Sequence, residues 1–391
     1  MTDVSDDRVE DLMTGARTSI TPEIVPADEV VHPTLATTYL GLTLAHPVVA
    51  SAGPLTRDAD GVRALADGGA AAIVLHSLFE EQLRAESARD IYIEESTEEF
   101  FAESLSFFPE VERTESPISH RYLDLLERAA SAVDVPVIAS LNGSDIGGWT
   151  QFARRMQDAG AAALELNVYL VPGDVTMRGR DVEDRHVEIV AAVTGEVDIP
   201  VAVKLSPYSS SFGELAIRLD EAGADGLVLF NRWTQPDIDI ESVAVQAGIE
   251  LSTPGEGRLP RTWIAALRGR VEANLAGTSG VETADDVVKY LLAGADVVMT
   301  TSSLVRHGPG HVRALVAGLE SWMARKGFSS VDDVRGLLSV PVDVDVTAYE
   351  RSGYVGALEQ AKQRYGSLSG TPVISAPPVG PVPTPPVDLE R

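Results

Sequence analysis

Two short turns rich in glycine and hydroxyl residues have the composition of a phosphate-binding site. The apolar residues 271–276 end in the turn 277–280 (GTSG), and residues 296–300 end in the turn 301–303 (TSS). Such turns expose backbone N–H groups, and two of them after the last strands of a β/α barrel can hold one phosphate. The alternative is a pair of ordinary tight turns. We favour a phosphate site because the two turns follow one another in a chain of alternating strands and helices.

Polar side chains also stand at the ends of the other predicted strands. They include Ser51, His76, Ser77, Ser140, Glu165, Asn167, Lys204 and Asn231. Lys204 is the most informative, because it lies near the end of the otherwise apolar segment IPVAVKL. A lysine there is costly unless an anion or an electron-rich ring accepts its charge. The alternative is an ion pair with Glu165 on the neighbouring strand.

The pattern of strands and helices predicts a TIM (β/α)8 barrel, which is an α/β fold. Short apolar strands alternate with amphipathic helices, as in parallel βαβ units. The predicted strands are residues 47–51, 71–76, 136–140, 162–167, 200–205, 226–230, 271–276 and 296–300. The predicted helices include residues 58–67, 120–133, 149–159, 182–193, 212–222 and 283–293. A doubly wound open sheet is the alternative, but no segment marks the reversal of direction that it needs.

The barrel is predicted over residues 37–340, between two extensions. Residues 1–36 are an acidic, irregular arm, and residues 341–391 form an extension that ends in a proline-rich tail. Two long connections, residues 77–119 and 231–260, follow strands and so belong on the C-terminal face, where a lid is expected. The first connection is alternatively an oligomer contact in a homodimer, because it exposes many apolar groups.

Composition and charge exclude several classes of protein and site. The 391 residues include no cysteine, which excludes disulfides, thiolate metal sites and a cysteine nucleophile. The seven histidines lack metal-ligand spacing, so we expect no metal. A formal net charge of -28 disfavours nucleic acid and anionic membranes as partners. No apolar run is long enough to span a membrane, and no secretory signal is recognisable, so we expect a cytoplasmic protein.

From residue 37 to residue 339 the chain resembles the class 1 dihydroorotate dehydrogenase family. The resemblance rests on five motifs in order, at residues 51–53 (SAG), 165–167 (ELN), 203–205 (VKL), 277–281 (GTSGV) and 301–303 (TSS). It implies a flavoprotein that binds FMN. FMN needs a phosphate site, a cation near N1 of the ring and small residues beneath the ring.

The resemblance implies a role for individual residues. Lys204 would lie near N1, and Ser140 and Asn167 would hydrogen-bond the edge of the ring. The cofactor-binding residues that we predict are Ser51, Ala52, Gly53, Ser77, Ser140, Asn167, Lys204, Asn231, Gly277, Ser279, Gly280, Thr301, Ser302 and Ser303.

The substrate half of the site departs from the family. In the family the ELN motif continues to a cysteine or serine that acts as general base, whereas Leu170 stands at that position here. Leu75 or His76 stands where a flavin-side lysine is expected, and Ser104 and Glu110 replace asparagines that would grip orotate. Tyr169 and His76 are therefore our candidates for acid–base chemistry, together with Lys204 as a catalytic residue. Alternatively, Tyr169 packs over the flavin and His76 is a satisfied histidine at a strand end.

These observations predict an FMN-dependent oxidoreductase that acts on CH–CH groups and transfers a hydride from a small-molecule substrate to flavin. The electron acceptor is unknown. One alternative is dihydroorotate oxidation itself, with a substituted base. Another is a non-catalytic flavin- or phosphate-binding subunit that docks a partner through the two long connections.

Overall fold

The computed structural model describes residues 32–82, 118–143, 149–168, 175–232, 236–246, 248 and 250–365. Residues 32–341 belong to one compact unit and residues 342–365 to another, and we describe each by itself. The second unit contains the helix α13 (Val346–Tyr365), most of whose described side chains are exposed. This helix was not predicted from the sequence. The domain boundaries at residues 36 and 340 stay a prediction.

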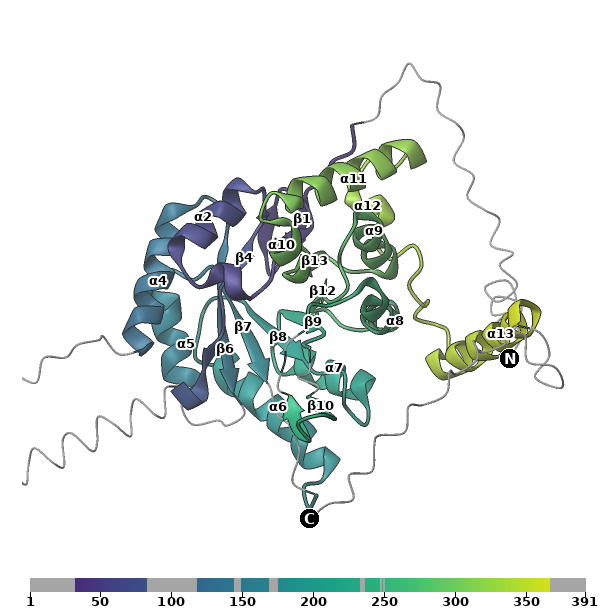
Figure 1. Ribbon diagram of the computed structural model, residues 1–391, viewed down its shortest axis with the longest axis horizontal. Coiled ribbons are helices and arrows are strands. Elements are labelled where there is room, and N and C mark those ends of the chain that lie inside the picture. The colour runs from purple at the N-terminus through teal and green to yellow at the C-terminus, as the bar shows by residue number, and fades with distance from the viewer. Residues whose placement is uncertain are drawn as a thin grey trace, which may run out of the picture. The chain divides into compact units, whose positions relative to one another are not determined.

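The larger unit is a closed barrel of parallel strands, as the alternation of strands and helices predicts (Figure 1). The ring closes because β4 pairs with both β3 and β6. Its strands are β3 (Val48–Ala50), β4 (Ile73–Val74), β6 (Val137–Gly143), β7 (Ala163–Val168), β8 (Val201–Leu205), β9 (Gly226–Leu229), β12 (Asn274–Gly277) and β13 (Val297–Thr300). The TIM-barrel prediction is confirmed, and the open sheet is wrong because this ring has no free edge.

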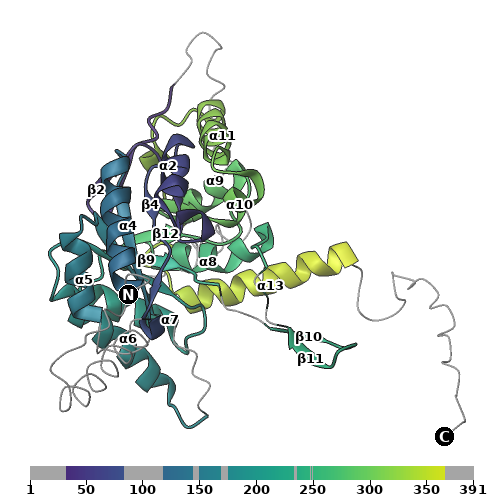
Figure 2. The ribbon, with the colours of Figure 1, turned by 60° about the vertical axis from the view of Figure 1, so that its left-hand side comes forward.

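Helices cover the outside of the barrel (Figures 1 and 2). They are α2 (Ala59–Asp67), α4 (Ile118–Ala132), α5 (Trp149–Asp158), α6 (Gly179–Thr194), α7 (Phe212–Glu221), α8 (Arg258–Leu267), α9 (Ala284–Ala293), α10 (Ser302–His307), α11 (His311–Lys326) and α12 (Val331–Val334). Gly160, Gly223 and Gly294 follow α5, α7 and α9 with φ of 93°, 94° and 121°. Glycine adopts this backbone conformation at little cost, so each helix can turn sharply into the next strand.

A hairpin that the sequence did not reveal packs against the amino-terminal end of the barrel. It consists of β1 (Thr37–Tyr39) and β2 (Leu42–Leu44), which pair antiparallel. The Leu40 N–H donates to Asn274 Oδ1 at 2.8 Å, and the Thr37 hydroxyl donates to the Asp296 carbonyl at 3.1 Å. Both acceptors stand at or just before the start of a barrel strand. The hairpin therefore fills the amino-terminal end and leaves the opposite end for ligands.

The barrel interior is layered because side chains alternate along each strand. A compact inner cluster includes Val49, Val74, Ile138, Ala163, Ala202, Val228, Ala276, Val297 and Met299. Two residues further along four of these strands stand Ser51, Ser140, Glu165 and Lys204. The period of two thus places polar side chains directly above an apolar floor, at the carboxyl end of the barrel.

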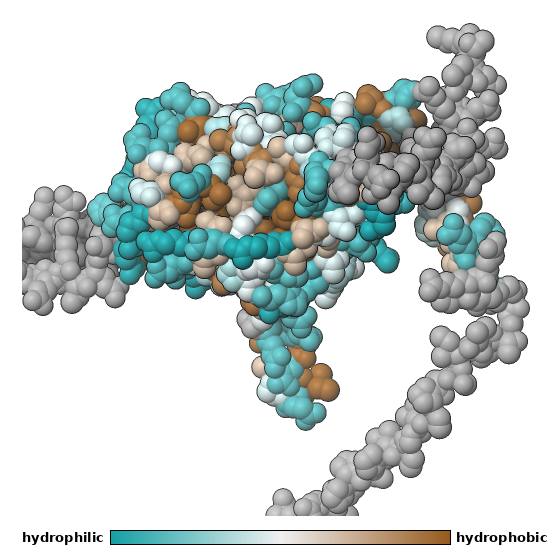
Figure 3. Space-filling view, turned by 90° about the horizontal axis from the view of Figure 1, so that it is seen from above, coloured by the Kyte–Doolittle hydropathy of each residue, from teal (hydrophilic) through white to brown (hydrophobic). Residues whose placement is uncertain are grey.

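The two long connections differ in what the structure describes. The first contains β5 (Leu78–Phe79), and its residues 83–117 lie outside the described part of the chain. The second forms a separate hairpin of β10 (Asp237–Asp239) and β11 (Ala244–Gln246) (Figure 2). The apolar side chains of Ile238 and Val245 are exposed on it. This connection continues through the 3-10 helix η2 (Pro254–Gly257) into α8. The face seen in Figure 3 also carries an apolar area bordered by hydrophilic residues, and apolar surface is common on folded proteins.

Candidate active site

Lys204 lies at the carboxyl end of the barrel, inside the ring of strands. Its ammonium is 3.4 Å from Glu165 Oε1 on β7 and 3.2 Å from Ser51 Oγ beyond β3. Lys204 is 7% exposed and Glu165 is 1% exposed. The ion pair that we considered as an alternative is therefore present. This ion pair leaves Lys204 able to bond a ligand as well, because an ammonium can donate three hydrogen bonds.

The side of the site built by β4 and β6 carries linked hydroxyl groups. Ser77 Oγ and Ser140 Oγ are 2.8 Å apart. The Tyr122 hydroxyl accepts from the Ser140 N–H at 2.9 Å and donates to the Ser140 carbonyl at 3.1 Å. Burial raises the pKa of Tyr122, so this phenol stays protonated. The two predicted serines thus lie together, with Tyr122 fixing the strand backbone behind them.

His76 lies beside these serines and is held by a backbone carbonyl. Its Nδ1 is 3.1 Å from the Thr56 carbonyl oxygen, and its ring and the Tyr122 ring are arranged edge to face at a centroid distance of 5.2 Å. Burial lowers the pKa of His76 more than the hydrogen bond to Thr56 raises it. The imidazole is therefore neutral at pH 7, and the carbonyl fixes its proton on Nδ1. Nε2 is left as the proton acceptor.

Asn167 and Asn231 meet across the site from β7 and the end of β9. Asn231 Nδ2 donates to Asn167 Oδ1 at 3.0 Å, and the Asn231 N–H donates to the Leu205 carbonyl at 2.7 Å. These contacts fix the orientation of both amides. Tyr169 and Leu170 follow Asn167 after Val168, and both lie outside the described residues.

The first predicted phosphate turn is oriented by Tyr290 of α9. The Tyr290 hydroxyl lies 2.6 Å from the Thr278 carbonyl oxygen and 2.7 Å from that of Ser279. In a trans peptide the N–H points opposite to the carbonyl. The N–H groups of Ser279 and Gly280 therefore point away from Tyr290, as a phosphate-binding turn requires. Gly277 lies against the ring itself, because a Cβ there would be 2.2 Å from Tyr290 Cδ1.

A third segment, which was not predicted from the sequence, joins the two turns. The Ser252 hydroxyl accepts from the Gly280 N–H at 3.3 Å, and Ser252 N and Oγ both lie 3.0 Å from Ser302 Oγ. Gly280 has a φ of 67°, and a Cβ there would be 2.6 Å from the Thr253 carbonyl oxygen. The only signal for this segment was its place in a long connection on the C-terminal face.

The second predicted turn is tied to the first strand of the barrel. The Thr301 hydroxyl lies 2.8 Å from the Ser51 carbonyl oxygen and 3.2 Å from that of Ala52. A Cβ on Gly53 would be 2.4 Å from Thr301 Cγ2, so glycine is required for this close approach. Ser303 is buried, and its hydroxyl bonds Thr300 at 2.8 Å. The hydroxyls of Thr301 and Ser303 therefore bond other groups of the protein and hold the second turn in position.

Comparison with known proteins identifies the family. The family model described as dihydroorotate dehydrogenase matches residues 98–323, which is more than half of the chain. The chain belongs to the dihydroorotate dehydrogenase family. Members of this flavoprotein family are oxidoreductases that act on CH–CH groups, and the chain is thus such an oxidoreductase. The match confirms the resemblance seen in its motifs.

Individual relatives extend this match over the barrel. The chain is 28% identical over 308 residues to the catalytic subunit of dihydroorotate dehydrogenase B (NAD(+)) from Thermoplasma acidophilum, which covers 78% of this chain and 98% of the relative. The corresponding subunit from Methanothermobacter thermautotrophicus is 28% identical over 312 residues, with the same coverage. That from Desulforudis audaxviator is 30% identical over 221 residues, covering 54% of this chain and 70% of the relative.

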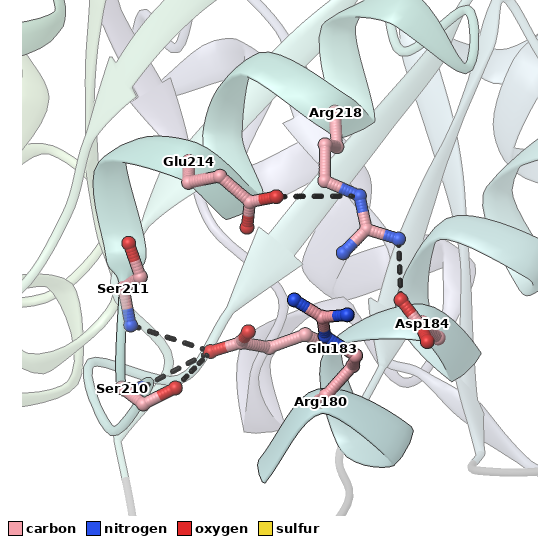
Figure 4. A pocket seen from close by; sticks show the side chains of 7 residues that line it. All are labelled: Arg180, Glu183, Asp184, Ser210, Ser211, Glu214 and Arg218. Carbon is pink, nitrogen blue, oxygen red and sulfur yellow. Dashed lines mark hydrogen bonds and ion pairs between the residues drawn. The ribbon is translucent and has the colours of Figure 1, made fainter.

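A surface pocket lies between α6 and α7 (Figure 4). Glu183 accepts hydrogen bonds there from the hydroxyls of Ser209 and Ser210 and from the N–H groups of Ser210 and Ser211. Burial alone would raise the pKa of Glu183, but these hydrogen bonds outweigh it and lower the pKa. Because Glu183 satisfies N–H groups at the start of α7, we interpret the pocket as a junction between helices.

The described part of the chain contains neither a cluster of metal ligands nor a membrane-spanning helix. No group of three histidine, aspartate or glutamate side chains there could hold a metal ion. No helix there is long and apolar enough to cross a membrane.

Proposed function

We propose that the chain binds FMN at the carboxyl end of the barrel and oxidises a small substrate. The observation that carries this proposal is the buried Lys204 ammonium, which lies 3.4 Å from Glu165 and 3.2 Å from Ser51 inside the barrel. A buried cation suits a ring that becomes anionic on reduction. The Ser279 N–H, turned away from Tyr290, suits a terminal phosphate, and the Gly280 N–H, which makes a long 3.3 Å contact with the Ser252 hydroxyl, would be shared between Ser252 and that phosphate.

The chain's own residues would position the cofactor. Bound flavin supplies the chemistry of hydride acceptance. Lys204 would hold positive charge beside the ring, and the small residues 51–53 would leave room beneath it. The Asn167 and Asn231 amides are already oriented by each other, so they can bond the ring edge without reordering. Ser302 and the turn 279–280 would bind the phosphate. The apolar layer below Lys204 would exclude water.

Oxidation of a CH–CH group also requires a proton acceptor. A hydride leaves one carbon, and the proton on the adjacent carbon must go to a base. We propose His76 or Tyr169 for this role. His76 is supported by its neutral state and by the hydrogen bond from Nδ1 to Thr56, which leaves Nε2 to accept a proton.

The test is a visible spectrum followed by anaerobic reduction. We expect a yellow protein that binds FMN in preference to FAD, because the two turns form one phosphate site. A protein that stays colourless after titration with FMN would contradict the proposal. Bleaching of the flavin by a donor under anaerobic conditions separates an enzyme from a non-catalytic flavin-binding subunit.

The substrate is the second part of the proposal. We expect dihydroorotate to be a poor substrate, because Leu170 cannot accept a proton and a general base contributes about 10²–10⁴-fold in rate. Stopped-flow bleaching at about 1–10³ per second, the usual range for enzymes, would contradict this expectation.

Dihydroorotate oxidation is also a candidate, because the chain covers 98% of catalytic subunits named for that reaction. The variants Tyr169→Phe and His76→Ala would then show which residue is the base. The electron acceptor is not assigned, and a homodimer stays a prediction.

A further inference from the structure

A single arginine ties together the three segments that form the predicted phosphate site. Arg306 of α10 donates from one terminal nitrogen to the Ser252 carbonyl at 2.8 Å and from the other to Glu282 Oε2 at 2.6 Å. Ser252 precedes η2, and Glu282 follows the turn after β12. Ser252 and Glu282 therefore lie in two of the three segments, and Arg306 lies in the third.

Glu282 is itself held in place, which makes it a firm anchor. Its Oε1 is 2.5 Å from His307 Nε2, and its carbonyl oxygen is 2.9 Å from His311 Nε2. Burial alone would raise the pKa of Glu282, but the contacts with His307 and Arg306 outweigh it and lower the pKa. Glu282 is therefore ionised at pH 7. The planar guanidinium holds two acceptors in one fixed geometry, whereas an ammonium on a flexible stem does not fix their relative positions.

The segment that Arg306 holds is the one that touches both turns. Ser252 lies between the Gly280 N–H and Ser302 Oγ, at 3.3 Å and 3.0 Å. Ser252 thus touches the same groups that would bind the phosphate, so movement of this segment would open that site. We propose that Arg306 is a positioning residue that latches residues 251–257 onto the two turns and so controls the release of the cofactor phosphate. This inference rests on the proposed binding of FMN.

The first test measures the release of FMN by stopped-flow fluorescence. We expect Arg306→Gln to release FMN at least tenfold faster than the wild type, and Arg306→Lys to recover only part of the loss. Arg154→Gln is the matched control, because Arg154 also donates to a backbone carbonyl, that of Glu196, at 2.8 Å. That contact is at an exposed site away from the turns, so the control should release FMN at the wild-type rate.

Two outcomes would overturn the latch. One is an unchanged release rate in Arg306→Gln. The other is full recovery in Arg306→Lys, since it would show that only the positive charge of residue 306 matters. Glu282→Gln should also accelerate release, and the double variant Arg306→Gln/Glu282→Gln should be no faster than Arg306→Gln alone. Additive effects of the two changes would mean that Glu282 does not act through Arg306.

The second test needs no cofactor and so separates this inference from the proposed function. Amide hydrogen exchange is measured on flavin-free wild type, Arg306→Gln and Arg154→Gln. We expect faster exchange in peptides that contain Ser252 and Gly280 only in Arg306→Gln, with unchanged exchange in the strands. Equal exchange in all three proteins would overturn the latch. A wild type that binds no FMN but shows this exchange pattern would contradict the proposed function and the control of phosphate release, and would support only the holding of residues 251–257 by Arg306.

Discussion

The Lys204 ammonium lies 3.4 Å from Glu165 Oε1, and Glu165 Oε2 has no hydrogen-bond partner among the described residues. Both side chains are buried. A buried ion pair is expensive to break, because removal of one partner leaves the other charge uncompensated. The end of the barrel therefore carries a coupled pair, and changes to its two members should affect a bound flavin in opposite directions.

Replacement of the cation should lower the flavin potential. In Lys204→Met the reduced anionic ring loses its stabilising charge, so we expect a lower midpoint potential and slower reduction. The unpaired Glu165 should also cost about 3–5 kcal/mol of unfolding free energy. Spectroelectrochemistry and chemical denaturation measure the two effects. A midpoint potential equal to that of the wild type would place Lys204 away from the ring.

Replacement of the anion should raise the flavin potential. In Glu165→Gln the ammonium of Lys204 keeps its charge without a counter-ion, so it should stabilise the reduced ring more strongly. The same titration measures this shift. The double variant Lys204→Met/Glu165→Gln should recover much of the stability lost in Lys204→Met and part of the lost potential, because the uncompensated carboxylate is also removed. A fall in potential in Glu165→Gln would mean that the carboxylate does not act through Lys204.

Removal of the Tyr290 hydroxyl should loosen the first turn. Tyr290→Phe leaves the carbonyl oxygens of Thr278 and Ser279 without their partner. Unsatisfied buried groups cost about 1–3 kcal/mol each, so we expect lower stability and weaker FMN binding. Riboflavin is the control ligand, because it has no phosphate. Equal losses of affinity for FMN and riboflavin would show that Tyr290 does not serve the phosphate.

The start of α9 should make the free energy of unfolding depend on pH in the acid range. Asp286 accepts hydrogen bonds from the Thr283 N–H and hydroxyl, each at 3.1 Å. Burial alone would raise the pKa of Asp286, but hydrogen bonds outweigh it and lower the pKa. Because the folded pKa lies below the ordinary value of about 3.9, this stabilisation is complete above that pH. It is lost as the pH falls through the folded pKa.

Asp286→Asn tests this dependence. We expect the variant to lose about 1–3 kcal/mol at pH 7, since hydrogen bonds to a charged group are strong. The difference in unfolding free energy between the two proteins should shrink as the pH falls below about 4. A constant difference across the acid range would contradict the assignment. Denaturant unfolding at several pH values provides the measurement.

The sequence by itself determined the barrel and the end at which its polar residues gather. The spacing of apolar residues indicates strands and helices, because burial repeats every two residues in a strand and about every 3.6 residues in a helix. Parallel strands bring their carboxyl ends together, so Ser51, Asn167 and Lys204 could be assigned to one site before any contact was known. The family motifs along the chain led to the same conclusion.

Only the tertiary structure decided which of these groups touch. Lys204 meets Glu165 and Ser51, which lie 39 and 153 residues away in the sequence. The β1–β2 hairpin and the Ser252 segment carry no periodic pattern that reveals where they pack, and Arg306 looks like any exposed arginine of a short helix. Hydrogen bonds between distant residues depend on distance and direction in space. Local propensity and spacing do not specify these, so the latch became visible only in the folded chain.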